Sequence, residues 1–116
     1  MAAPLPPPPA QIPYEDFAKL ELRIAEVLEA VEHPNATRLL VLKVKVGEEV
    51  RQVVAGIREA YPTAELVGRR VVLLANLAPA MIRGVESQGM LLAADLEGKA
   101  VLLRPDRDVP SGSRVR

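Results

Sequence analysis

The most constraining feature of the chain is one segment that alternates apolar and charged side chains and then turns back on itself. Over residues 39–46, Lys43 and Lys45 alternate with aliphatic residues, and the same type of segment resumes over residues 50–54. Gly47-Glu48-Glu49 separates the two. A period of two is typical of a strand, and a short glycine-containing connection joins two strands as a β-hairpin. Residues 39–54 therefore predict a β-hairpin and disfavour a helical bundle.

Other short elements are expected on both sides of this hairpin. Strands are predicted over residues 70–75, 90–93 and 100–103, with Gly98 separating the last two. Short helical turns are predicted at 14–18 and at 57–61, the second stopped by Pro62, and residues 76–88 are expected to form a long irregular loop. Five or six short strands with brief helical turns predict an all-β fold, a small β-barrel.

Residues 20–31 leave two interpretations open. Apolar residues recur there at helical spacing, at Leu20, Ile24, Val27, Leu28 and Val31. Leu20, Leu22 and Ile24 also alternate with other residues, as in a strand that continues past a bulge. The pattern alone slightly favours the helix.

The N-terminal segment differs in composition from the rest of the chain, because six of the eleven prolines lie in the first thirteen residues. Such a segment prefers the polyproline II conformation and is typical of a stiff spacer, although a simple disordered tail is the alternative. We predict a proline-rich linker over residues 1–12 and one domain over residues 13–116. On this interpretation the chain is the C-terminal piece of a longer protein.

The formal net charge of zero conceals an uneven distribution. Residues 1–32 carry two basic and six acidic groups, residues 33–85 carry eight and four, and residues 86–116 carry five of each. The middle of the chain is therefore a basic segment with a net charge of +4, following an acidic one of −4. A local basic surface is the electrostatic signature of a nucleic-acid binder. The formal net charge of zero, taken alone, would argue against such a function.

The chain lacks the residues that most kinds of catalytic site require. The chain has no Cys and a single His, so neither a thiolate nucleophile nor a cysteine- or histidine-rich metal site is expected. The sequence contains no phosphate-binding glycine loop and no serine-nucleophile motif. It also contains no apolar run long enough to predict a membrane span and no segment that predicts a signal peptide. We expect a non-catalytic, cytoplasmic protein without cofactor or metal.

Polar motifs punctuate the apolar framework in a characteristic order. They are Lys19-Leu20-Glu21-Leu22-Arg23, His33-Pro34-Asn35-Ala36-Thr37-Arg38, Arg51-Gln52-Val53-Val54-Ala55-Gly56, and Asn76-Leu77-Ala78-Pro79 continuing to Arg83-Gly84-Val85-Glu86-Ser87-Gln88-Gly89-Met90. With these motifs, nearly all of residues 12–116 resembles the tRNA-binding domain appended to the C-terminus of many bacterial methionyl-tRNA synthetases. Free-standing dimeric tRNA-binding proteins carry a similar domain.

The resemblance implies an OB-fold five-stranded barrel with short added helical turns, in which residues 20–31 form a long bent first strand. It also implies a homodimer that binds tRNA by shape and increases its capture by a synthetase whose catalytic portion lies upstream in the same chain. Two alternatives remain open: a protein-interaction module similar to a secretion chaperone of the same family, and a domain that only dimerises.

Eight residues are candidates for contacts with RNA: Lys19, Arg23, His33, Lys43, Arg51, Asn76, Arg83 and Ser87. Glu21 is expected to hold Arg23, and a purely structural role in a turn is an equal alternative for His33. The chain has only three aromatic residues, whereas single-strand binders stack bases on aromatic side chains. We therefore expect recognition through phosphate, ribose and shape.

Overall fold

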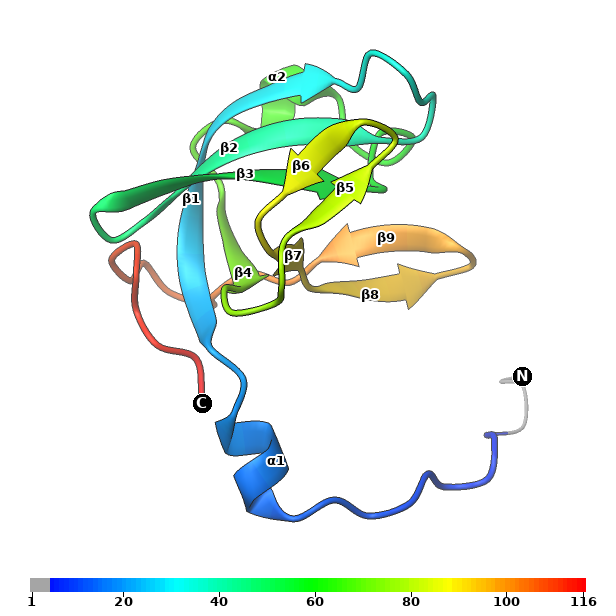
Figure 1. Cartoon of the computed structure of the whole chain (residues 1–116), viewed down its shortest axis with the longest axis vertical. Helices are drawn as coiled ribbons and strands as arrows, with labels where there is room; N and C mark the ends of the chain where they lie inside the picture. The colour runs from blue at the N-terminus through cyan, green and yellow to red at the C-terminus, as the bar shows by residue number, and fades with distance from the viewer. Residues whose placement is uncertain (1–4) are drawn as a thin grey trace.

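Residues 5–116 are described by a computed structural model, in which strands dominate (Figure 1). The helices are α1 (Tyr14–Ala18) and α2 (Thr63–Leu66), and the strands are β1 (Leu22–Glu32), β2 (Leu40–Val46), β3 (Glu49–Ala55), β4 (Arg70–Leu74), β5 (Ala80–Ile82), β6 (Val85–Ser87), β7 (Met90–Leu91), β8 (Ala93–Leu96) and β9 (Lys99–Leu102). Five of them form a curled sheet in the order β3-β2-β1-β4-β7, in which every pairing is antiparallel. The hairpins β5–β6 and β8–β9 form two further small sheets. The all-β, OB-type prediction is confirmed.

Strand β1 is the central strand, because it pairs with β4 over residues 22–26 and with β2 over residues 26–32. A register shift between Val27 and Glu29 marks a bulge, which lets one strand serve both partners as the sheet curls. The bent first strand is thus confirmed, and the helical preference of the pattern is wrong. The cause is burial on both faces: Ala25 lies in the main core, whereas Leu22 and Ile24 lie in a second cluster.

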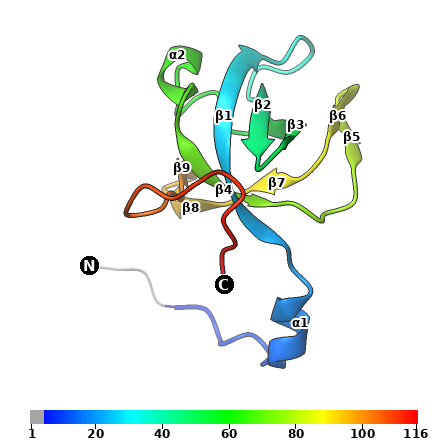
Figure 2. The same cartoon turned by 90° about the vertical axis from the view of Figure 1, so that its left-hand side faces the viewer.

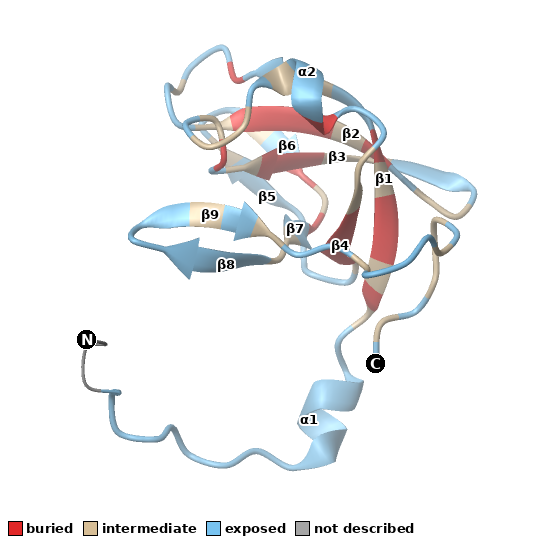
Figure 3. Ribbon diagram, turned by 180° about the vertical axis from the view of Figure 1, so that it is seen from behind, coloured by how far each residue is buried: buried red, intermediate tan, exposed pale blue. Residues whose placement is uncertain are grey.

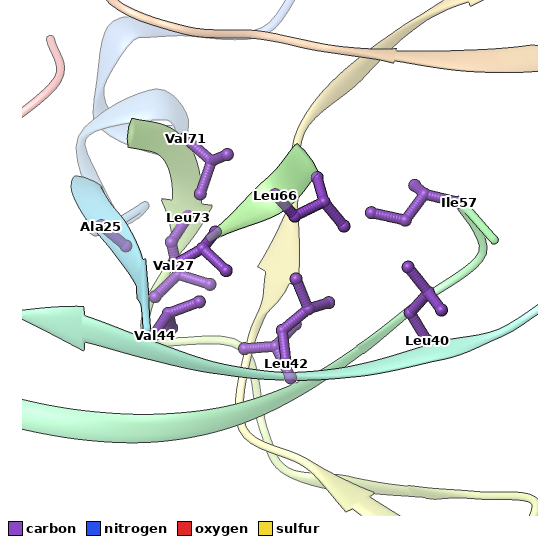
Figure 4. Packing of buried hydrophobic residues seen from close by; sticks show 10 residues of the cluster. Ala25, Val27, Leu40, Leu42, Val44, Ile57, Leu66, Val71 and Leu73 are labelled. Carbon is purple, nitrogen blue, oxygen red and sulfur yellow. The ribbon is translucent and has the colours of Figure 1, made fainter. Parts of the chain in front are cut away.

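The main core is entirely aliphatic, as the shortage of aromatic residues predicts (Figure 4). It consists of Ala25, Val27, Leu40, Leu42, Val44, Val53, Ile57, Leu66, Val71 and Leu73. Leu66 brings α2 against the end of the barrel, and its side chain is fully buried. Burying a side chain of this size contributes about 1.5–3 kcal/mol. Figure 3 shows buried segments along β1, β2, β3 and β4, whereas α1, β8 and much of β9 are exposed.

The outer edge of β3 is covered by residues 86–89 rather than by another ladder. The backbone N–H of Gln52 donates to Gln88 Oε1 at 3.0 Å, and the backbone N–H of Gln88 donates to the Gln52 carbonyl at 2.8 Å. The N–H of Val54 donates to Ser87 Oγ at 2.9 Å. These bonds satisfy an edge that would otherwise expose free backbone groups, and they hold β6 beside β3.

The predicted helical turn at residues 57–61 is only partly correct. Residues 58–60 form a turn, and the N–H of Tyr61 donates to the Ile57 carbonyl at 3.0 Å, but no helix is formed there. The helix α2 instead follows Pro62, which is extended at φ −61° and ψ 140°. Proline is well tolerated just before or at the start of a helix because its missing N–H is not needed there. Pro62 therefore precedes a helix rather than stopping one.

The predicted irregular loop over residues 76–88 is also corrected, because it contains the β5–β6 hairpin. Its turn is formed by Arg83 at φ 54° and Gly84 at φ 88°. Two consecutive positive φ angles are what a tight hairpin turn requires. With this hairpin, and with residues 90–93 divided between β7 and β8, residues 5–116 form nine strands rather than five or six.

The C-terminal segment lies along the first half of β1. The N–H of Ile24 donates to the Ser113 carbonyl at 2.8 Å, and the N–H of Val115 donates to the Leu22 carbonyl at 2.9 Å. Gly112 passes so close to Gly47 that a Cβ at position 112 would lie 2.9 Å from the Gly47 backbone. The segment thus extends the wall of the sheet beside the β2–β3 turn.

Residues 5–13 lie away from the barrel, and α1 lies below the barrel in Figure 1. Residues 5–13 are exposed and form neither helix nor strand, as a proline-rich linker requires. The first four residues of the predicted linker lie outside the described part of the chain. The linker over residues 1–12 and the domain boundary at residue 13 remain predictions.

Candidate nucleic-acid interface

The β5–β6 turn is joined to the loop between β1 and β2 by reciprocal hydrogen bonds. Arg83 Nη2 donates to the Asn35 carbonyl at 3.2 Å, and Asn35 Nδ2 donates to the Arg83 carbonyl at 3.3 Å. The guanidinium of Arg83 makes no ion pair within residues 5–116 and lies at the surface. The hairpin therefore presents a positive charge whose position is fixed by the loop beside it.

His33 is a positioning residue for this loop. Its side chain is buried, with an exposed fraction of 3% for the residue. Its Nδ1 accepts the N–H of Asn35 at 2.9 Å, so Nε2 carries the proton and donates to the Ile82 carbonyl at 3.0 Å. Both ring nitrogens are occupied by the protein. Of the two roles weighed for His33, the geometry supports the structural one.

Ser87 is used in the same way. It is 3% exposed, and its hydroxyl accepts from the Val54 N–H and donates to the Gly89 carbonyl at 3.0 Å. Gly89 has φ +135°, and a Cβ there would lie 2.9 Å from the Leu74 carbonyl oxygen. Ser87 and Gly89 together close the barrel and leave no hydroxyl free for a ligand.

Asn76 ties the start of β1 to the end of β4. Its Oδ1 accepts the Glu21 N–H at 2.8 Å, and its Nδ2 donates to the Lys19 carbonyl at 2.7 Å. The amide predicted to bind RNA is thus occupied within the chain. The ammonium of Lys19 is different, because its side chain is 78% exposed and its contact with Asp16 is a long 3.4 Å.

Arg23 is held as expected by Glu21. Its Nη2 and Nε lie 2.9 Å and 3.2 Å from Glu21 Oε2, and Nη1 donates to the Gly112 carbonyl at 3.3 Å. These contacts turn the guanidinium toward the C-terminal segment. Arg23 is therefore not brought together with the hairpin that carries Arg83.

Arg51 faces the end of β4 and is clamped on both sides. Its Nε donates to Glu49 Oε1 at 2.7 Å, and its Nη1 donates to the Ala75 carbonyl. The hydrogen bond and the positive charge of Arg51 lower the pKa of the exposed Glu49 carboxyl below its ordinary value. Arg51 consequently stabilises the barrel wall and shares its charge with a carboxylate.

Lys43 lies between the acidic and the basic parts of the chain. Its Nζ donates to Gln52 Oε1 at 3.0 Å, and Gln52 Nε2 donates to the Glu86 carbonyl at 2.8 Å. In the β1–β2 register Glu29 lies directly across from Lys43, as Glu26 does from Lys45. The acidic first strand therefore borders the basic second strand, and their opposite charges lie side by side.

Two clefts flank the β5–β6 hairpin. One of about 480 Å³ is lined by residues 33–37, Arg58 and Arg83, and another of about 330 Å³ is lined by Glu49, Arg51, residues 75–79 and Gln88. Arg58 was not singled out by any sequence motif. It makes an ion pair with Glu32 at 2.6 Å and donates to the Ala36 carbonyl at 3.0 Å.

Hydrogen bonds place five of the eight candidates on or beside β3 and the β5–β6 hairpin, which are neighbours in Figure 2. Lys43, Arg51 and Arg83 supply positive charge there, whereas His33 and Ser87 support the backbone. Asn76 and Lys19 lie at its margin, next to the cleft beside Arg51. Such a surface can bind phosphates and ribose edges without stacking bases.

Within residues 5–116 no cluster of three or more potential metal ligands occurs. The two helices of this part of the chain are too short to cross a lipid bilayer.

A family model described as "Putative tRNA binding domain" matches residues 22–114, which includes every strand of the fold. The chain belongs to this family. The methionine–tRNA ligase of Thermococcus kodakarensis is 52% identical over 105 residues, which is 90% of this chain and 14% of the ligase. The tRNA-binding-type domain thus spans about one seventh of the length of that relative.

Solved structures share the fold of this tRNA-binding-family domain. A MetRS related protein from Pyrococcus horikoshii is 35% identical with a TM-score of 0.86, and the match covers 92% of this chain and 99% of that one. The chaperone CsaA from Bacillus anthracis is 31% identical with a TM-score of 0.84, and the match covers 92% of this chain and 100% of that one. The same barrel is therefore present in proteins with different described roles.

Proposed function

We propose that this chain is a non-catalytic tRNA-binding domain at the C-terminus of a cytoplasmic methionyl-tRNA synthetase, where it increases tRNA capture during aminoacylation. The observation that carries the proposal is the exposed Arg83 guanidinium, which the β5–β6 turn presents without an ion pair in residues 5–116, while Lys43 and Arg51 add positive charge on the neighbouring strands β2 and β3. The similarity to methionine–tRNA ligases over 90% of this chain supports the tethered arrangement. Tethering raises effective concentration, so a weak domain can add about 10²–10⁴-fold to avidity.

The aromatic residues support phosphate and shape recognition over base stacking. Tyr61 is occupied, because Arg69 lies 5.3 Å from its ring centroid and its hydroxyl accepts the Leu102 N–H at 3.0 Å. Tyr14 and Phe17 lie together on α1, away from the barrel surface that carries the hairpin. A folded RNA, recognised by its backbone, fits such a surface better than an unpaired strand does.

The test is a titration of folded tRNA at several salt concentrations with the wild type and with Arg83→Ala. Arg83 is the best probe because its guanidinium carries no ion pair in the described chain and its loss leaves the core untouched. Loss of one phosphate contact should weaken binding and reduce the magnitude of the log–log salt slope by about one. Arg116→Ala is the matched control, since it removes the same charge at the C-terminus. A salt-independent affinity, or equal effects of the two variants, contradicts the proposal.

Dimerisation is the second part of the proposal. On α1, Tyr14 is 72% exposed and Phe17 is 37% exposed, and Leu20 just beyond it is 40% exposed. Apolar side chains that remain exposed in one copy are suited to cover those of another. Sedimentation of the chain should show a dimer that dissociates on dilution, and the paired change Tyr14→Ser with Phe17→Ser should weaken it. A monomer at micromolar concentration contradicts this part only.

A protein-binding role is the alternative that one observation favours, namely the 0.84 TM-score with the chaperone CsaA. Exposed apolar residues at Leu77, Met81 and Met90 lie near the same hairpin and are the features such a role would use. Binding of an unfolded polypeptide would persist at high salt, whereas tRNA binding would weaken. Competition between the two ligands on one preparation separates the functions.

A further inference from the structure

A second basic cleft lies on the other side of the barrel. It has a volume of about 510 Å³, and its walls are the segment 68–70, where the chain enters β4, and the segment 104–108, which follows β9. In Figure 2 the orange segment after β9 lies on the left of the barrel and the β5–β6 hairpin lies on the right. Four of the lining residues are arginines: Arg69, Arg70, Arg104 and Arg107.

Arg70 carries a donor that the protein leaves unused. Its Nε is buried and has no hydrogen-bond partner within residues 5–116. Glu26 lies directly across from Arg70 in the β1–β4 register, but no ion pair within 4.0 Å joins them. A buried N–H without a partner is rare in folded proteins, and a bound water or a bound anion would supply the missing acceptor.

The neighbouring wall is already fixed in position. Arg69 Nε donates to the Glu65 carbonyl at 2.8 Å, and its guanidinium lies 5.3 Å from the Tyr61 ring centroid. The backbone is held as well, because the Gly68 N–H donates to the Val27 carbonyl at 2.8 Å and the Val27 N–H donates to the Arg69 carbonyl at 2.9 Å. A ligand would thus meet two consecutive arginines whose backbone does not need to rearrange.

The cleft keeps a net positive charge after its acids are counted. Asp106 and Asp108 also line it, so four arginines face two carboxylates. Arg107 Nε lies 4.0 Å from Asp106 Oδ2, and both side chains are more than 90% exposed. Such a long and solvated pair leaves the guanidinium available to another anion. Arg104 makes no ion pair in the described part of the chain.

We propose that this arginine cleft binds a phosphate group between the guanidinium of Arg70 on one wall and those of Arg104 and Arg107 on the opposite wall. Guanidinium is suited to the task because its planar donors match two phosphate oxygens at once. The group belongs either to a free phosphate compound or to the backbone of an RNA that reaches this side. The site goes beyond the tRNA-binding surface at β5–β6 and does not depend on it.

The direct test is a titration of the ¹⁵N-labelled chain with inorganic pyrophosphate, followed by NMR. The Nε–H signal of Arg70 should shift and saturate together with the amides of residues 68–70 and 104–108. The paired change Arg104→Ala with Arg107→Ala lies on an exposed segment and should weaken binding on the order of tenfold. Arg38→Ala is the control, because Arg38 is an exposed arginine outside the cleft. No saturable shift at Arg70, or equal loss in the control, overturns the proposal.

A second arm identifies the source of the phosphate. If RNA supplies it, the Arg104→Ala/Arg107→Ala protein should bind tRNA with a salt slope smaller in magnitude by about one to two. If a free compound supplies it, pyrophosphate binding should weaken and tRNA binding should not change. Failure of tRNA to bind the wild type while pyrophosphate still shifts Arg70 contradicts the function proposed above and leaves the cleft intact. Normal tRNA binding without a pyrophosphate-induced shift at Arg70 contradicts the phosphate site in the cleft and leaves the proposed tRNA-binding function standing.

Discussion

At the scale of single residues, Arg51 shows how a predicted phosphate contact also serves the barrel. It donates to Glu49 at 2.7 Å and to the carbonyl of Ala75, which lies at the end of another strand. Its charge is therefore shared between the wall and any ligand. Removal of Arg51 should report on both roles through different measurements.

We expect Arg51→Gln to raise the pKa of Glu49 back toward its ordinary value, because the hydrogen bond and charge that lower it disappear. The pKa of Glu49 is lowered in the folded state. The ionised carboxyl therefore stabilises the fold above the unfolded pKa near 4.5, and this contribution is lost as pH falls through the folded pKa. The stability difference between wild type and variant should thus shrink in acid. Carbon-13 NMR of the Glu49 carboxyl measures the shift directly, with Arg38→Gln as the unaffected control; an unchanged Glu49 pKa in Arg51→Gln contradicts the assignment.

Gly89 provides the second residue-level prediction. With φ +135° and a would-be Cβ 2.9 Å from the Leu74 carbonyl oxygen and 3.0 Å from Leu73 Cδ1, alanine cannot fit without moving backbone. Gly89→Ala should lower the free energy of unfolding by about 1–3 kcal/mol or more. Gly98→Ala is the matched control, since Gly98 also has a positive φ but nothing lies within 4 Å. Urea denaturation measures the free energy of unfolding of both variants. Equal decreases would show that the positive φ alone, and not the close approach of Leu74 and Leu73, destabilises Gly89→Ala.

At the scale of elements, the sequence predicts best where one face of a strand is buried and the other is not. The β2–β3 hairpin was predicted from alternation because its partners are adjacent in the chain and its turn contains Gly47 at φ +63°. The same alternation does not predict strand β1 clearly, because its first half is buried on both faces. The β5–β6 hairpin was not predicted because a non-glycine, Arg83, adopts the positive φ of its turn.

The candidate site divides along similar lines. Residue type and spacing nominated Arg83 and Lys43 as candidates, of which Arg83 is exposed and Lys43 is half-buried. They could not show that His33 bonds to Ile82, 49 residues away, or that Asn76 bonds to Glu21, 55 residues away. Distant hydrogen-bond partners decide whether a polar side chain is free, and no local pattern encodes them.

The loop–hairpin junction yields a prediction at this scale. His33→Ala should loosen the β1–β2 loop from β5–β6 by removing the bonds to Ile82 and Asn35. Affinity for tRNA should fall because Arg83 is less well positioned, whereas the salt slope should stay close to that of the wild type because no charge is lost. Measuring both quantities for His33→Ala and for Arg83→Ala separates positioning from contact. A reduced slope in His33→Ala would contradict the positioning role.

At the scale of the whole molecule, neighbouring strands of opposite charge lie in a chain whose formal net charge is zero. Glu26 and Glu29 on β1 lie across from Lys45 and Lys43 on β2, and Glu32 is paired with Arg58 at 2.6 Å. The acidic strand thus screens basic groups that border the proposed RNA surface. We infer that this arrangement weakens the binding of duplexes that lack the shape of tRNA.

Neutralising the three acids with Glu26→Gln, Glu29→Gln and Glu32→Gln should therefore raise affinity for random duplex RNA, on the order of tenfold at low salt, since each exposed pair is worth up to about 1 kcal/mol. The gain should vanish at high salt, and tRNA affinity should rise less if, as proposed, this ligand is recognised by its shape. Glu15→Gln, Asp95→Asn and Glu97→Gln remove the same charge from α1 and from the β8–β9 hairpin, away from β2. Equal gains in the two triple variants would mean that net charge alone governs nonspecific binding, whereas a gain confined to the β1 variant locates the screening in the β1–β2 pairing.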